Sequence, residues 1–279
     1  MEIKNLTKED IFKMDYNQLI GLTKETNRIP GGKKTIFEIL NKVFVNRDTK
    51  ILEIGTSTGF TSIEISRLVK CAITSIDINQ MSLDEAKNRA LNEGFDNIKF
   101  IQADVNELPF QEGEFDLVII GNVFSLMIDK ERALKECRRV CKKTGFLAVV
   151  PLFYLEKPSE ELIQNVSNAI HVNITPYFKQ DWINFFNLPG IEIFWSEDYS
   201  FDYMNDDIIK HFVKSILERE HLKELNKDAF EELKNKYTNY MYLFRENLSK
   251  MGFSIILLAN IRLWEDPELY TSRKVKNEG

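Results

Sequence analysis

Short apolar runs alternate with amphipathic stretches between residues 48 and 150. Apolar runs bounded by glycine or aspartate are typical of buried strands, whereas apolar residues spaced three or four apart predict helices. The run Ile51-Leu52-Glu53-Ile54 ends at Gly55, and the stretch after it has helical spacing. We therefore expect strands at residues 51–54, 72–76, 98–101, 115–120 and 146–150, and helices at residues 61–70, 83–92 and 128–142.

This alternation predicts a doubly wound α/β fold, with a mostly parallel sheet covered by helices on both faces. Ligands of such open sheets bind beyond the carboxyl ends of the strands. Glu53, Asp77, Asp104 and Asn122 lie at or just beyond the carboxyl ends of consecutive expected strands. We expect these four side chains to converge on one crevice.

The flanking regions extend this core. Residues 1–46 predict two helices joined by the turn at residues 28–32, and two further strands are expected at residues 191–195 and 253–259. These two strands would close a seven-stranded sheet as an antiparallel edge, with a helical insertion before the last strand. The expected layout is one domain, residues 1–279, with a helical cap at 1–46, a cofactor-binding core at 47–150 and a closing region at 151–270 that includes the insertion at about 206–250.

Charge and composition narrow the class of partner. The chain has 43 acidic and 37 basic residues, a net charge of −6. This balance argues against general nucleic-acid binding, which needs a positive surface. The beginning of the chain lacks the apolar run of a signal peptide, and no stretch approaches the ~20 apolar residues of a membrane span. Three cysteines without a C-x-x-C pair indicate neither a disulfide framework nor a metal site. We expect a cytoplasmic protein without membrane contact.

The loop Gly55-Thr56-Ser57-Thr58-Gly59 has two open interpretations. Two glycines between a strand and a helix let a ligand approach bare backbone at a helix N-terminus. The dinucleotide fingerprint fails, because Ser57 and Ser62 stand where glycines are required. The loop also matches G-x-S-x-G, the nucleophile elbow of α/β hydrolases, with Ser57 as nucleophile. That alternative further needs an acidic residue and a histidine later in the chain. It also needs an oxyanion loop before the elbow, but the sequence predicts helices in that region.

The spacing of acidic residues favours a cofactor loop. Asp77 follows Gly55 by 22 residues and ends the second expected strand. A carboxylate at this position can accept hydrogen bonds from both hydroxyls of a ribose. Asp104, after the third strand, can accept from an exocyclic amine. Ser57 is then better interpreted as a replacement for glycine than as a nucleophile.

These motifs, taken in order, resemble the class I S-adenosylmethionine-dependent methyltransferases, and in particular the Rossmann-type enzymes that methylate small molecules. The resemblance covers residues 48–150 and weakens at the final strands. The matching segments are Ile51-Leu52-Glu53-Ile54-Gly55-Thr56-Ser57-Thr58-Gly59, Ile76-Asp77-Ile78, Gln102-Ala103-Asp104-Val105, Phe115-Asp116-Leu117-Val118 and Arg138-Arg139-Val140-Cys141-Lys142-Lys143 followed by Gly145.

The resemblance implies S-adenosylmethionine as cofactor and assigns residues to each end of it. Gly55, Thr56 and Gly59 would lie against its methionine part, Glu53 would orient its ammonium group, and Asn122 would lie near the sulfonium. At the nucleoside end, the corresponding residues are Asp77 for the ribose, Ile78 for packing on the adenine, Asp104 for its amine and the backbone N–H of Val105 for its ring.

Methyl transfer from a sulfonium is an in-line displacement, so a protein mainly supplies alignment. A general base is needed only if the acceptor must lose a proton. The stretch after the fourth expected strand, residues 123–127, has no titratable side chain. His171, Tyr154 and Tyr16 are candidate bases, and for each of them ordinary packing is the stronger interpretation.

The acceptor is less clearly indicated than the cofactor. The insertion carries regularly spaced aromatic residues, which suggest a lid over an apolar pocket. We expect a small, partly apolar acceptor molecule. A second hypothesis is a catalytically silent regulatory protein that binds S-adenosylmethionine, and a third is the α/β hydrolase that uses Ser57. The oligomeric state is not indicated.

Overall fold

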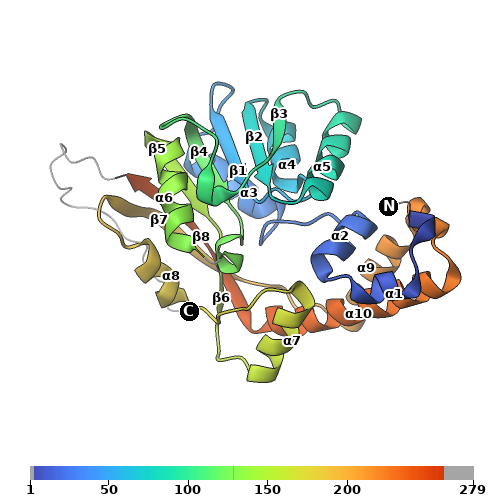
Figure 1. Ribbon diagram of the computed structural model, residues 1–279. Helices are drawn as coiled ribbons and strands as arrows, with labels where there is room; N and C mark the ends of the chain where they lie inside the picture. The colour runs from blue at the N-terminus through green and yellow to red at the C-terminus, as the bar shows by residue number, and fades with distance from the viewer. Residues whose placement is uncertain (1–2, 128, 261–279) are drawn as a thin grey trace.

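A computed structural model describes residues 3–127 and 129–260. Its centre is one eight-stranded sheet in the order β3-β2-β1-β4-β5-β8-β6, with β7 paired to β8 (Figure 1). The strands are β1 (Lys50–Ile54), β2 (Ala72–Asp77), β3 (Ile98–Gln102), β4 (Phe115–Ile120), β5 (Cys141–Val149), β6 (Leu152–Tyr154), β7 (Ile191–Ser200) and β8 (Met251–Asn260). Strands β1 to β5 pair in parallel and β8 is antiparallel to its neighbours, which confirms the predicted fold class.

The sheet has one strand more than the sequence predicted. The additional strand, β6, is only three residues long and follows β5 almost directly. Pro151 separates the two, and β5 and β6 pair with successive parts of β8. A run this short carries no periodicity of its own, so the sequence did not distinguish it from the end of the preceding strand.

Both faces of the sheet are buried by helices. Along β4, Leu117 and Ile119 face one apolar cluster, whereas Val118 and Ile120 face the other, because successive side chains of a strand point to opposite faces. The first cluster is covered by α3 and α4 and the second by α6 and α8. The helices of the chain are α1 (Lys8–Lys13), α2 (Tyr16–Thr23), α3 (Lys33–Lys42), α4 (Phe60–Leu68), α5 (Gln80–Asn92), α6 (Lys130–Val140), α7 (Glu160–Ile170), α8 (Lys179–Phe186), α9 (Asp206–Leu217) and α10 (Lys227–Ser249).

The N-terminal region contains three α-helices, so the prediction of two was wrong. Two capping boxes explain the difference: Thr7 with Asp10 begins α1, and Asp15 with Gln18 begins α2. Each pair satisfies two backbone N–H groups at a helix start, which permits a break between two short helices. Helix α7, which begins after the N-cap Ser159, was also not predicted.

The N-terminal helices and the insertion form a single cap. Figure 1 shows α1 and α2, in blue, packed against α9 and α10, in orange. They share an apolar cluster that includes Leu19, Leu222, Leu233 and Tyr237, all with no exposed surface. The cap therefore joins segments that the sequence placed in separate regions. The closing region expected to reach residue 270 is described only to residue 260, and the first residue of the helix expected at 128–142 also lies outside the described residues.

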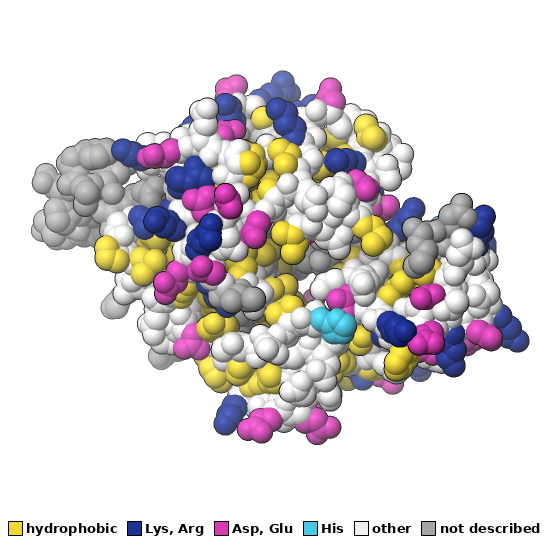
Figure 2. Space-filling model, in the orientation of Figure 1, with side chains coloured by type: hydrophobic (Ala, Val, Ile, Leu, Met, Phe, Trp, Pro, Cys, Tyr) yellow, Lys and Arg dark blue, Asp and Glu magenta, His cyan; other side chains and the backbone are white. Residues whose placement is uncertain are grey.

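Within the described ranges, no helix combines the length and the apolar character that crossing a membrane requires. Lysine and arginine side chains are interspersed with aspartate and glutamate over the face shown in Figure 2.

Candidate functional site

The glycine loop connects β1 to α4 at the carboxyl edge of the sheet. The backbone N–H groups of Gly55 and Thr56 both donate to the Ile76 carbonyl of β2, at 2.8 and 2.9 Å. Gly55 has φ +72° and Gly59 has φ +82°, a region that side chains disfavour. A Cβ atom on Gly55 would lie 2.4 Å from Cγ2 of Val123, so both conformation and space require glycine there.

Ser57 adopts the left-handed conformation as well, with φ +48°. Its backbone N–H donates to Oδ2 of Asp77 at 2.8 Å. The loop therefore uses this residue through its backbone, and its left-handed conformation is one that glycine adopts readily. Two of the three histidines have partners in the cap: Nε2 of His221 lies 3.0 Å from the Leu22 carbonyl, and His171 lies beside Asp15.

Glu53 supports the loop from inside the protein. Its side chain is 4% exposed, and its Oε2 accepts hydrogen bonds from the hydroxyls of Thr56 at 2.7 Å and Ser75 at 3.0 Å. Burial raises the pKa of Glu53, and these hydroxyls oppose that rise. A buried carboxyl costs free energy unless it is hydrogen-bonded, so these contacts explain how Glu53 is tolerated at the end of β1.

Asp77 ends β2 beside the loop. Its Oδ2 accepts from the Ser57 N–H, and its Oδ1 accepts from the N–H of Asn79 at 2.9 Å. Burial raises the pKa of Asp77, and these N–H groups oppose that rise. Each carboxylate oxygen has a second acceptor position, so two ribose hydroxyls can still be bound. The next residue, Ile78, is 70% exposed and offers an apolar surface at the same edge.

Asp104 lies on the neighbouring chain segment. The Ala103 N–H donates to the Asp77 carbonyl at 3.1 Å, so the end of β3 follows the end of β2 directly. Asp104 is exposed and caps the short helix at Val105–Glu107 by accepting from the Asn106 N–H at 2.8 Å. The structure thus brings Glu53, Asp77 and Asp104 to one edge of the sheet.

Asn122 has a structural function. Its Oδ1 accepts from the Ser125 hydroxyl at 2.6 Å and from the Leu152 N–H at 3.2 Å. It therefore ties the loop after β4 to the start of β6. A contact with the cofactor would have to use its amide nitrogen.

The three candidate bases differ in their surroundings. The Tyr154 hydroxyl donates to Oδ1 of Asn247 at 2.7 Å, and the Tyr16 hydroxyl lies 3.1 Å from both carboxylate oxygens of Glu25. Burial raises the pKa of both phenols, and in Tyr16 the charge of Glu25 raises it further. Both phenols therefore stay protonated at neutral pH and are poor proton acceptors. The side chain of His171 is 62% exposed, with its Nδ1 3.6 Å from Asp15.

Sequence reasoning did not identify Glu25. This residue follows α2 and is 8% exposed, and its carboxylate accepts from the hydroxyls of Tyr16 and Tyr237. Tyr237 is 212 residues away along the chain. No local pattern marks such a pair, and only the packing of α10 against α2 shows it.

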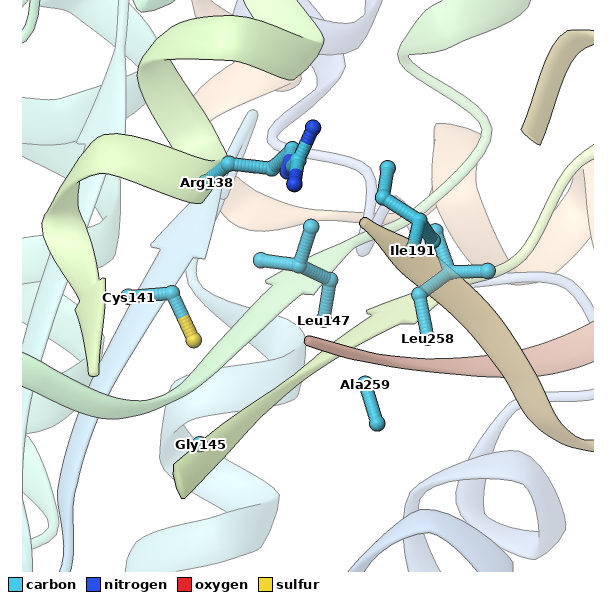
Figure 3. A pocket seen from close by; sticks show the side chains of 7 residues that line it. All are labelled: Arg138, Cys141, Gly145, Leu147, Ile191, Leu258 and Ala259. Carbon is cyan, nitrogen blue, oxygen red and sulfur yellow. The ribbon is translucent and has the colours of Figure 1, made fainter. Parts of the chain in front are cut away.

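Two cavities lie away from this edge. The first has a volume of about 10 Å³, room for at most one water molecule. Figure 3 shows its lining residues, Arg138, Cys141, Gly145, Leu147, Ile191, Leu258 and Ala259. A larger hollow of about 400 Å³ includes Asp48, Thr49 and Asp116, at the amino ends of β1 and β4. Neither adjoins the glycine loop, so neither is the candidate cofactor site.

The family model described as "Methyltransferase domain" matches residues 45–241. The chain belongs to this methyltransferase family. The match includes strands β1 to β7 and most of the insertion and ends before β8, and S-adenosylmethionine is the cofactor.

The individual relatives share only a modest fraction of their sequence with this chain. An uncharacterized protein of Haemophilus influenzae is 28% identical over 181 residues, 64% of this chain and 72% of that protein. The ubiquinone/menaquinone biosynthesis C-methyltransferase UbiE of Azotobacter vinelandii is 33% identical over 135 residues, 47% of this chain. The match spans only about half of that enzyme, 52% of its length. The crystal structure of MccD protein shares the fold, with a TM-score of 0.71 and 22% identity, and covers 84% of this chain and 100% of its own.

The residues at the carboxyl edge fit this cofactor. Asp77 retains acceptor positions for a diol, Ile78 is an exposed apolar side chain beside it, and Asp104 is an exposed carboxylate one strand further. A nucleoside with two ribose hydroxyls and an exocyclic amine matches this order of groups.

Proposed function

We propose that this methyltransferase acts on a small, partly apolar acceptor held between the carboxyl edge of the sheet and the helical cap. The observation that supports the proposal is the cap itself. It is tied to the glycine loop because the Thr58 hydroxyl donates to the Glu25 carbonyl, and it carries partly buried aromatic side chains. Tyr16, Tyr240 and Phe244 pack against one another, with ring centroids 4.6 to 6.0 Å apart. A cap of this kind excludes water from a small molecule, as methyl transfer requires.

For the nucleoside end of the cofactor, we propose four contacts. Asp77 accepts from the ribose hydroxyls, and Ile78 packs on the adenine. Asp104 accepts from the adenine amine, and the backbone N–H of Val105 meets the ring. The support is their adjacency at the ends of β2 and β3, with Asp77 and Ile78 in direct succession.

For the methionine end, we propose that Gly55, Thr56 and Gly59 present bare backbone to the cofactor. Glu53 orients the ammonium group from below the loop. The amide nitrogen of Asn122 would lie near the sulfonium, because its Oδ1 is already bound to Ser125 and Leu152. Bound there, S-adenosylmethionine supplies an electrophilic methyl group. The protein holds it in line with the acceptor and keeps water out.

We infer that the acceptor attacks without a built-in general base. Tyr16 and Tyr154 donate their hydroxyl protons to fixed partners inside the protein. His171 is the candidate for acceptors that must lose a proton, because its imidazole is exposed at the end of α7 beside α2. A nucleic-acid acceptor is disfavoured by the net charge of −6 and by the interspersed surface charges (Figure 2).

The proposal is tested in two steps. Calorimetry first measures the binding of S-adenosylhomocysteine. Formation of S-adenosylhomocysteine from S-adenosylmethionine is then followed with panels of small amines, phenols, thiols and carbon acids, with peptides and RNA as comparison panels. We expect turnover only in the small-molecule panel. Turnover confined to peptides or RNA would contradict the proposal, and cofactor binding without turnover in any panel would favour a catalytically silent binding protein.

A further inference from the structure

Glu25 lies where the cap meets the cofactor loop. Its carboxylate accepts from the Tyr16 hydroxyl of α2, 3.1 Å from each oxygen, and from the Tyr237 hydroxyl of α10 at 2.6 Å. Tyr16 belongs to the N-terminal part of the cap and Tyr237 to the insertion. One carboxylate therefore joins both halves of the cap.

The backbone of the same residue holds the loop. The Thr58 hydroxyl donates to the Glu25 carbonyl at 3.0 Å and accepts from the Asn27 N–H at 3.2 Å. Arg89 of α5 adds hydrogen bonds to the hydroxyls of Thr26 and Thr58, at 3.0 and 3.3 Å. Thr58 is fully buried between the two glycines of the loop. A displacement of Glu25 therefore acts directly on the loop.

Burying the Glu25 carboxylate between apolar helices costs free energy. Burial raises the pKa of Glu25, and the two hydroxyls, with the charges of Arg219 and Arg28, oppose that rise. Arg219 also donates to the Thr23 carbonyl at 2.8 Å, so it holds the same segment. An apolar side chain would bury at lower cost if stability alone mattered. The hydrogen-bonded geometry instead fixes one position of the cap relative to residues 25–27.

We propose that Glu25 is a positioning residue that couples the docking of the cap to the conformation of the cofactor loop. Seating of α2 and α10 on the carboxylate holds residues 25–27 against Thr58, which keeps the loop in its binding conformation. Loosening either tyrosine weakens cofactor binding at a distance. By reciprocity, a bound cofactor stabilises the docked cap.

The test measures the affinity of the full chain for S-adenosylhomocysteine by calorimetry, which needs no acceptor and so is independent of the proposed reaction. Tyr237→Phe removes one hydroxyl from Glu25 and leaves the ring in place. We expect about a five-fold rise in Kd, within the usual range of coupling between sites. Glu25→Gln, which keeps the shape of the side chain, is expected to change the affinity in the same direction. Tyr242→Phe, also on α10 but beside Arg245 rather than Glu25, is the matched control and should leave Kd unchanged.

A double-mutant cycle tests the route of the coupling. Thr58→Val removes the hydroxyl that contacts the Glu25 carbonyl and should also raise Kd. If Glu25 acts through Thr58, the effects of the two changes should overlap. The combined variant, Tyr237→Phe with Thr58→Val, should then have a Kd only slightly above that of the single variant that binds more weakly. The proposal is overturned if Tyr237→Phe lowers only the melting temperature and leaves Kd unchanged. It is equally overturned if the two changes multiply as independent effects.

Discussion

The backbone N–H of Ser57 donates to Oδ2 of Asp77 at 2.8 Å. This bond joins the glycine loop after β1 to the acid that ends β2. It orients the carboxylate and holds Ser57 in its left-handed conformation at the same time. Two of the motifs on which the family resemblance rested are thus one physical unit, and changes at either residue should affect the other.

We expect Asp77→Asn to weaken binding of S-adenosylhomocysteine about 10- to 100-fold, because hydrogen bonds to a charged acceptor contribute about 1.5–3 kcal/mol. Isothermal titration calorimetry measures the change. Asp116→Asn is the control, because Asp116 lies near the start of β4, at the opposite edge, and pairs with Lys142 at 2.6 Å. That variant should lose stability and keep its affinity. An equal loss of affinity in both variants would contradict the assignment of Asp77.

Cofactor affinity should fall as the pH is lowered. Burial raises the pKa of Asp77 from its ordinary value, so protonation starts at a higher pH than in an exposed aspartate. The carboxylate is the form that accepts from ribose hydroxyls, and affinity is lost as the pH falls through this raised pKa. Calorimetric titrations across a pH series measure the effect, and Asp77→Asn should flatten the profile. An unchanged profile in that variant would show that another group titrates.

The raised pKa of Asp77 affects folding stability in the opposite direction from cofactor affinity. A carboxyl whose pKa is raised in the folded state favours folding most in its protonated form. Its contribution to stability is therefore fully present below the unfolded-state pKa and declines as the pH rises through the folded-state pKa. Glu25 and Glu53 are shifted in the same direction by burial. Urea denaturation of Glu53→Gln should accordingly show a weaker decline in stability over that pH range than the parent protein.

Gly55→Ala should destabilise the protein through both conformation and space. The left-handed backbone costs an alanine about 1–2 kcal/mol, and overpacking costs about 1–3 kcal/mol more. The new Cβ would lie 2.4 Å from Cγ2 of Val123, so adding Val123→Ala should relieve the overlap but not the backbone cost. Gly94→Ala is a matched control, because Gly94 also has φ +72°, but a Cβ atom there would meet none of the described residues within 4 Å. Equal urea-unfolding losses for Gly55→Ala and Gly94→Ala would rule out the steric contribution.

Tyr154→Phe should cost about 1–3 kcal/mol of stability, because it leaves the buried Oδ1 of Asn247 without its donor. Replacing both partners, Tyr154→Phe with Asn247→Leu, should recover part of the loss. Urea denaturation compares the three proteins. Affinity for S-adenosylhomocysteine should stay at the parent value in Tyr154→Phe. A stability equal to that of the parent would show that the hydroxyl is not a structural donor.

Much of the candidate site was predictable because its signals are local. Strand ends are marked by glycine or aspartate within a few residues of an apolar run, as at Gly55, Asp77 and Asp104. The order of these residues along the chain then predicts that they meet at one edge, since parallel strands bring their carboxyl ends together. The contacts of these residues with the cofactor stay predictions. The break between α1 and α2 was missed because its signal, the capping pair Asp15 and Gln18, lies in a short segment without an apolar period.

Local signals in the sequence therefore specify the α/β class, the glycine loop and the acidic edge, because apolar periodicity and turn chemistry act over a few residues. Three properties became visible only in the folded protein: residues from both flanks build one cap, Tyr16 and Tyr154 donate to fixed partners, and Glu25 joins the cap to the loop. Those properties depend on burial and on hydrogen-bond partners as far apart as Glu25 and Tyr237. A buried carboxyl cannot be recognised until the helices that bury it are in place, and no local pattern records which helices those are.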